Sequence, residues 1–185
     1  MTWSLPEAAE IGGKTYTIYT DYRDILDIIR LLQSETDGQQ ALVTALALFY
    51  EEFPDMPVVD YTEAWNYLRD FISCGEADDG RMHPKLIDWE QDGSIIAAEI
   101  NKVAHMEVRS VPEMHWFTFI GYFHGIGEGQ LSSIVSIRQK KSKGKKLEKW
   151  EREFYQENKA KIDFKTNLTD EEQAEIDRIN ALLGD

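Results

Sequence analysis

The sequence predicts a mainly α-helical protein, a single helical domain of about seven to eight helices with a small N-terminal β-hairpin. Two observations predict it. Apolar residues recur every three or four positions through most of the chain, which places them on one face of successive helices. Only residues 9–18 carry a clear strand pattern. We expect this domain to cover residues 1–165 and to be followed, over residues 166–185, by an acidic amphipathic helix that either docks on the body or stays free.

The strand pattern is interrupted by Gly12 and Gly13, with β-prone residues on both sides. Two glycines suit a two-residue turn in which both central residues have positive φ. A hairpin of two strands is marginally stable alone, so we expect it to lie on the helices.

Amphipathic helices are predicted over residues 21–34 and 39–53, joined by about four polar residues and therefore packed antiparallel. Further helices are expected to begin at a capping box over residues 60–63 and at Asp88, the latter running to about Val103. The remaining ones are predicted over residues 131–141 and 145–161, and from a last capping box at Thr169.

The most apolar stretch begins with Ser110-Val111-Pro112-Glu113, which predicts a capping box and a helix start. Six large apolar side chains follow within ten positions: Met114, Trp116, Phe117, Phe119, Ile120 and Phe123. Glycines from Gly125 onward end the helix. Such a helix is either the buried centre of a domain or a surface that another protein covers.

Charge is unevenly distributed along the chain, whose formal net charge is −14. Residues 1–137 carry 8 Lys and Arg against 23 Asp and Glu, residues 138–165 carry 11 against 5, and residues 166–185 carry 1 against 6. The acidic body should repel nucleic acid. Arg138 and the lysines after it are predicted to be solvent-exposed, in a solvated linker whose lysines face acidic patches elsewhere on the protein. The alternative is that this segment binds phosphate groups.

No pattern of catalytic or metal-binding residues is complete. Of four histidines, His115 and His124 lie nine apart and fall on opposite sides of the predicted helix. The Asp88–Asp92 carboxylates could chelate Mg²⁺, although helix capping explains Asp88 and Gln91. Cys74 is the single cysteine and has no activating pattern. We therefore expect no enzyme activity, no cofactor and no metal, and no window is long and apolar enough for a membrane span.

An ordered set of short motifs, each unspecific alone, resembles a bacteriophage family named for a gene-fifteen product of phages and prophages of Gram-positive bacteria. The motifs are Ile11-Gly12-Gly13-Lys14, Thr20-Asp21-Tyr22-Arg23, Asp88-Trp89-Glu90-Gln91-Asp92, Met114-His115-Trp116-Phe117-Thr118-Phe119, Ile134-Val135-Ser136-Ile137-Arg138 and Trp150-Glu151-Arg152-Glu153-Phe154-Tyr155. The resemblance covers about Leu5 to Phe164. Phe117 departs from it, since members often have a second tryptophan there.

The resemblance implies a tail-assembly chaperone, because family members are encoded next to the tape-measure gene of long-tailed phages. The implied partners are the tape-measure protein and a second tail-assembly protein, with self-association left open, in the host cytoplasm and absent from the mature virion. The alternatives are a structural tail component retained in the particle and a nucleic-acid-binding or metal-dependent enzyme. The partner-binding candidates are Trp116, Phe117, Phe119, Ile120, Phe123, Trp150 and Phe154.

Overall fold

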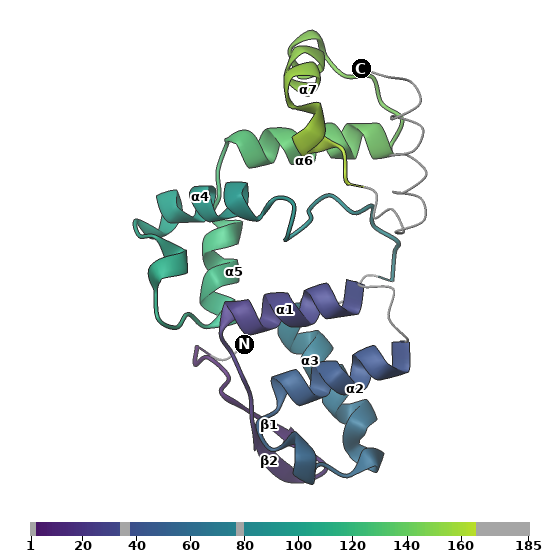
Figure 1. The fold of residues 1–185 in the computed structure, drawn as a ribbon, viewed down its shortest axis with the longest axis vertical. Helices are drawn as coiled ribbons and strands as arrows, with labels where there is room; N and C mark the ends of the chain where they lie inside the picture. Colours follow the sequence, from purple (N-terminus) through teal and green to yellow (C-terminus); the bar gives the residue numbers. More distant parts are fainter. Residues whose placement is uncertain (1–2, 34–37, 77–79, 166–185) are drawn as a thin grey trace, which may run out of the picture. The chain divides into compact units, whose positions relative to one another are not determined.

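The computed structural model describes residues 3–33, 38–76 and 80–165, which form seven α-helices and one two-stranded sheet (Figure 1). This confirms the predicted mainly helical class with an N-terminal hairpin. The chain divides into two compact units, residues 1–133 and residues 134–185. The C-terminal helix predicted from Thr169 lies outside the described residues.

The N-terminal hairpin pairs β1 (Ala8–Ile11) with β2 (Lys14–Thr17) in an antiparallel register that places Ala9 opposite Tyr16. Gly12 and Gly13 have φ values of 57° and 76°, as the two-glycine turn requires. Ala9, Ile11 and Tyr16 are buried while their neighbours along the strands are exposed. One face of the hairpin is therefore part of the core of the first unit.

The turn of the hairpin packs against the start of α3 (Tyr61–Ile72). The Gly12 amide donates to Glu63 Oε2 at 3.1 Å, and the Asp60 carboxylate lies so close that a Cβ added at Gly12 would be 2.5 Å from Oδ2. The predicted capping box over residues 60–63 is wrong, because the Asp60 side chain makes no capping bond to α3. Its two carboxylates face the hairpin instead.

Helices α1 (Tyr22–Gln33) and α2 (Gly38–Phe49) pack against each other and run in opposite directions, as predicted (Figure 1). Helix α2 ends four residues before the predicted Phe53. The reason is that Tyr50 forms a β-bridge with Ile18, and this pairing takes the chain out of the helix. The Phe49 ring then packs 5.1 Å from Phe71 of α3 in the core.

Helix α4 (Gly93–Ala104) begins five residues after the predicted start at Asp88. Asp88 instead holds a turn, in which its Oδ1 accepts from the amides of Glu90 and Gln91 at 3.0 and 2.8 Å. The amide of Asp88 donates to Oδ2 of the buried Asp92 at 3.0 Å. These bonds engage the carboxylates of Asp88 and Asp92, two of the three that had suggested a Mg²⁺ ligand set.

Helix α5 (Trp116–His124) begins six residues after Ser110, so the predicted capping box over residues 110–113 is also wrong. Ser110 ends a short 3₁₀-helix, Val108–Ser110. The N-cap of α5 is His115, whose Nδ1 accepts from the Phe117 amide at 3.0 Å. The predicted glycine stop is confirmed, since Gly125 is the C-cap.

The second unit contains most of α6 (Gln130–Ser142) and all of α7 (Lys149–Ile162). Arg138 was predicted to be solvent-exposed, but only 5 % of its surface is exposed. Its guanidinium donates to the carbonyls of Ile162 and Lys161 at 2.7 and 2.8 Å and lies 4.1 Å from the Phe164 ring. The last carbonyls of a helix have no donor within it, so Arg138 supplies the missing donors for α7.

The apolar spacing of the helix predicted over residues 145–161 places Leu147, Trp150, Phe154 and Tyr155 on one inward face, and the structure differs from this at Trp150. Trp150 is 53 % exposed, whereas its neighbour Glu151 is 1 % exposed. Lys140 donates to Glu151 Oε2 at 2.8 Å. This bond compensates for burial of the carboxylate, so the helix turns Glu151 inward and Trp150 outward.

Candidate functional site

Helix α5 is held at its N-terminal end by an extended segment that pairs with the start of α1. The Met114 amide donates to Asp21 Oδ2 at 2.8 Å, and the Met114 carbonyl accepts from the Tyr22 amide at 2.9 Å. The Trp116 amide donates to the Thr20 carbonyl at 2.7 Å. These bonds keep the chain extended up to His115, so α5 cannot begin earlier.

Three of the candidate partner-binding residues on α5 are buried: Trp116 is 1 % exposed, Phe119 3 % and Ile120 9 %. Phe119 stacks on Tyr22 with ring centroids 4.3 Å apart, and the Trp116 indole N–H donates to the Ile72 carbonyl at 3.0 Å. A buried indole that has found an acceptor is typical of a core position. These three side chains therefore belong to the core of the first unit, beneath its surface.

Phe117 and Phe123 are only partly buried, which divides the candidates on α5 into two sets. Phe117 lies 5.0 Å from Phe71, and Phe123 lies 5.1 Å from Trp89, both between ring centroids. Each ring thus rests on the aromatic core along one side and reaches solvent along another. A partner bound to α5 would contact these two side chains first.

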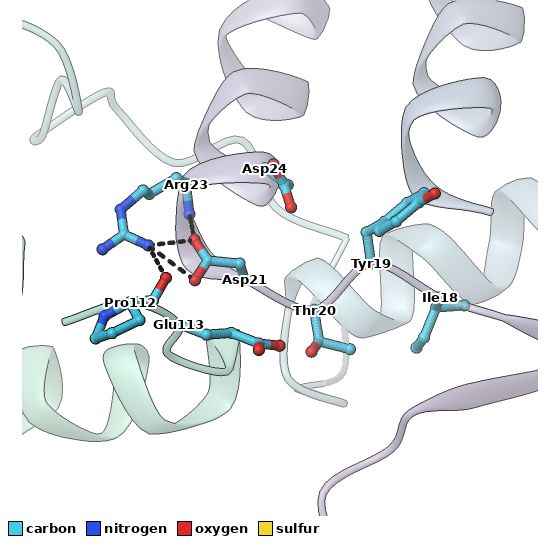
Figure 2. A pocket seen from close by; sticks show the side chains of 8 residues that line it. All are labelled: Ile18, Tyr19, Thr20, Asp21, Arg23, Asp24, Pro112 and Glu113. Carbon is cyan, nitrogen blue, oxygen red and sulfur yellow. Dashed lines mark hydrogen bonds and ion pairs between the residues drawn. The ribbon is translucent and has the colours of Figure 1, made fainter. Parts of the chain in front are cut away.

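A pocket of about 410 Å³ opens beside the pairing between α1 and the extended segment (Figure 2). Its lining is Ile18, Tyr19, Thr20, Asp21, Arg23, Asp24, Pro112 and Glu113. Arg23 Nη1 pairs with Asp21 at 3.0 Å and also donates to the Pro112 carbonyl at 3.4 Å. Arg23, the only cation among the lining residues, is therefore already paired with other residues of the pocket.

The pocket has an excess of negative charge. Asp24 and Glu113 make no hydrogen bond through their side chains and no salt bridge within the described residues, and Figure 2 shows both beside the opening. Burial, followed by repulsion from Asp21, raises the pKa of Asp24. This arrangement favours a cationic side chain over an anion.

In the second unit, the remaining candidates Trp150 and Phe154 lie on α7, and Phe154 is half-buried. Among the basic residues around them, Lys140 binds Glu151, and Lys141 binds both Asp163 and the Tyr155 hydroxyl. These two lysines were predicted to lie in a solvated linker facing acidic patches elsewhere, but they lie on α6 and bind single carboxylates of the same segment. The lysines from Lys143 onward are exposed.

Within the described ranges, no three His, Cys, Asp or Glu side chains come together as a metal site. His115 caps α5, and its other ring nitrogen lies 3.0 Å from the Pro6 carbonyl. Burial raises the pKa of the Cys74 thiol to about 11, so the thiolate needed for nucleophilic attack is scarce at neutral pH. The helices of the described residues are too short or too polar to cross a bilayer.

Sequence reasoning missed the pocket and the role of Arg138. Asp21 and Arg23 are part of a motif that carried the family resemblance, but their neighbours in the pocket come from residues 112–113, nearly ninety positions away. Arg138 also ends one of those motifs, yet its partners are carbonyls of α7. Backbone acceptors and pairings so distant leave no pattern in a single sequence.

These features define a small α-helical protein with an N-terminal hairpin, an aromatic core around α5 and an acidic surface pocket. A family model described as "Bacteriophage Gp15 protein" matches residues 1–164. The chain belongs to this bacteriophage family. No curated protein and no solved structure matches it.

Proposed function

We propose that this phage protein is a non-enzymatic tail-assembly chaperone that binds the tape-measure protein and keeps it soluble until the tail tube polymerises. Membership of the bacteriophage Gp15 family over residues 1–164 is the observation that carries the proposal. A second tail-assembly protein joins the complex, which forms in the host cytoplasm and is absent from the finished virion.

The surface of the first unit has properties that such a role requires. A tape-measure protein is a long amphipathic helix, and a helix of that kind binds by placing its apolar face against apolar side chains. Phe117 and Phe123 offer aromatic surface at the edge of a rigid core, so little conformational entropy is lost on binding. The net charge of −14 favours solubility of the complex.

The acidic pocket adds a means of orienting the partner. Its two carboxylates without salt bridges, Asp24 and Glu113, suit a lysine or arginine that follows the apolar face of the bound helix. Charge pairs at the rim of an interface set orientation and association rate more than affinity. We therefore assign affinity to the aromatic side chains and orientation to the pocket.

Co-expression with the tape-measure protein encoded in the same phage genome tests the proposal. We expect the two proteins to purify as a complex, with more tape-measure protein in the soluble fraction than when it is expressed alone. Replacing Phe117 and Phe123 by alanine should reduce both readouts. Replacing Val58 and Val59 by alanine is the matched control, because these side chains are also apolar and are 76 % and 84 % exposed.

Absence of a complex and of any gain in solubility would exclude the chaperone function. Loss of binding in the Val58/Val59 variant alone would keep the function and move the site away from α5. Mass spectrometry of purified particles separates the chaperone from a structural tail component, because only the structural component stays in the particle.

A further inference from the structure

The basic residues at the end of α6 and the start of α7 form two sets with different environments. Arg138, Lys140 and Lys141 bind groups of the same unit. The second set is exposed and consists of Lys143, Lys145, Lys146 and Lys149, which we call the lysine loop. Its closest salt bridge within the described residues is a 4.0 Å contact from Lys149 to Glu153.

The backbone of the lysine loop is fixed by a Schellman motif at the end of α6. The Lys145 amide donates to the Lys140 carbonyl at 2.9 Å, and the Gly144 amide donates to the Lys141 carbonyl at 3.0 Å. Gly144 has a φ of 62°, the left-handed conformation that this motif requires. The lysines after α6 therefore project from a defined turn.

The other end of the loop is anchored through a buried carboxylate. Glu151 Oε2 accepts from the Glu148 amide at 2.8 Å and from Lys140 at 2.8 Å. One side chain thus ties the first turn of α7 to α6. Because both ends are held, the exposed ammonium groups start from a restricted set of positions and lose less entropy on binding.

Next to Lys149, Trp150 presents a half-exposed indole. Tryptophan is enriched at protein-binding surfaces, where it anchors apolar atoms of the partner. The lysines beside it add charge that is complementary to an acidic partner. In the described part of this unit, Glu151 and Asp163 are paired with Lys140 and Lys141, and residues 138–165 carry 11 basic against 5 acidic residues. The lysine loop is therefore positive charge that residues 138–165 do not neutralise.

We propose that the lysine loop and Trp150 form a self-association site that binds the acidic surface of a second copy of this chain. Charge complementarity carries the choice of occupant. Residues 138–165 contain 11 basic against 5 acidic residues, whereas residues 1–137 of the second copy contain 8 against 23. Repulsion between the remaining charges is screened within about 8 Å at physiological salt, so the local contact decides.

A nucleic acid fits this surface less well. Its affinity would depend on the number of phosphates that lysines neutralise. Four exposed lysines are few for that purpose, and any long polyanion would also meet the rest of a chain with a net charge of −14. The contact pairs a basic surface of one copy with an acidic surface of the other, which a two-fold dimer can make twice and a head-to-tail contact once.

Sedimentation velocity of the full chain tests the proposal, over a roughly hundredfold range of protein concentration and in about 0.05 to 0.5 M salt. We expect association that strengthens with protein concentration and weakens with salt. The dissociation constant of the variant K143E/K145E/K146E should be at least roughly tenfold higher than that of the natural chain, and that of W150A should also be higher.

The matched control is K14E/R69E/K159E, which makes the same change in net charge at three exposed basic residues outside the loop. It should associate more tightly than the loop variant, and circular dichroism should show equal helix content in both. A chain that is monomeric under all conditions, or an equal loss in both variants, overturns the proposal. The proposal is also overturned if the natural chain stays monomeric and binds a single-stranded oligonucleotide that the loop variant does not bind while the control variant still does.

Discussion

Replacing Gly12 by alanine is expected to destabilise the first unit by about 1.5–3.5 kcal/mol, through two separate effects. Gly12 has a φ of 57°, and an L-residue in this left-handed region costs about 1–2 kcal/mol. The added Cβ would also lie 2.5 Å from Asp60 Oδ2 and 2.7 Å from Asp60 Cγ. The carboxylate, which ends a partly buried side chain, would have to rotate away, and an off-rotamer side chain costs about 0.5–1.5 kcal/mol.

Gly13 provides the matched control, because it shares the backbone cost without the steric one. Its φ is 76°, and an added Cβ would meet nothing within 4 Å. We therefore expect Gly13→Ala to cost about 1–2 kcal/mol, with the extra loss in Gly12→Ala arising from Asp60 alone. In an Asp60→Ala background, which removes no helix-capping bond, the two glycine variants should become equal.

Urea unfolding followed by tryptophan fluorescence measures these differences. Four of the five tryptophans lie in residues 1–133, so the signal reports mainly on the first unit. Equal free energies of unfolding for Gly12→Ala and Gly13→Ala in the natural background would refute the reasoning, because the Asp60 contact would then have no energetic effect. A difference that persists without Asp60 would refute it as well.

Three further predictions concern groups that the fold has buried. Arg138→Met should lower the free energy of unfolding by about 1.5–3 kcal/mol in urea titrations, since the Ile162 carbonyl loses a charged donor; an unchanged midpoint would contradict this. The hydrogen bond from Lys140 lowers the pKa of Glu151, so its stabilisation is complete above the unfolded pKa of about 4.3 and is lost as the pH falls through the folded pKa. Urea midpoints from pH 7 to 3 should therefore fall less steeply in Glu151→Gln, and an unchanged slope would disprove this role. Because burial raises the pKa of Cys74 to about 11, a disulfide reagent at pH 8 should react at least roughly tenfold more slowly with the folded than with the urea-unfolded protein, and equal rates would rule out the protection.

The sequence predicted elements whose signals are local. The Gly12-Gly13 turn needs two positive φ values, which two adjacent glycines supply at no steric cost, and the structure has both. The amphipathic helix predicted over residues 21–34 matches α1 to within one residue at either end. Gly125 likewise marked the end of α5 correctly.

Helix starts were predicted less well, because a capping pattern describes a side chain that can cap and not what else it can bind. At α3 the predicted start is correct, since the helix begins at Tyr61, but the capping bonds are not: Asp60 and Glu63 turn to the Gly12 region, where Glu63 accepts a backbone amide. Asp88 also had backbone donors in reach, the amides of Glu90 and Gln91, and accepts from them in a turn before α4. The tertiary fold brings the Gly12 amide to Glu63, whereas the donors to Asp88 lie only two and three residues along the chain.

For the candidate site on α5, the sequence indicated which residue types take part but not which of their side chains are exposed. Trp116 and Phe119 are as aromatic as Phe117, yet they are buried because α5 lies with that face against Trp89 and Tyr22. Helical spacing alone could not divide them, since a helix that is apolar around most of its circumference has no polar face to fix its rotation. The extended segment bound to Asp21 fixes that rotation.

A partner can therefore reach two kinds of surface, and they differ in charge. On the first unit, Phe117 and Phe123 are the accessible aromatic side chains of α5, and the unit also has an acidic pocket that suits a cationic group. On the second unit, Trp150 lies next to the lysine loop, which suits an anionic group. One partner segment cannot match both surfaces with the same charges. If the first binds the tape-measure protein, the second remains open for another copy of the chain, and the two proposals can be tested independently by variants of different units.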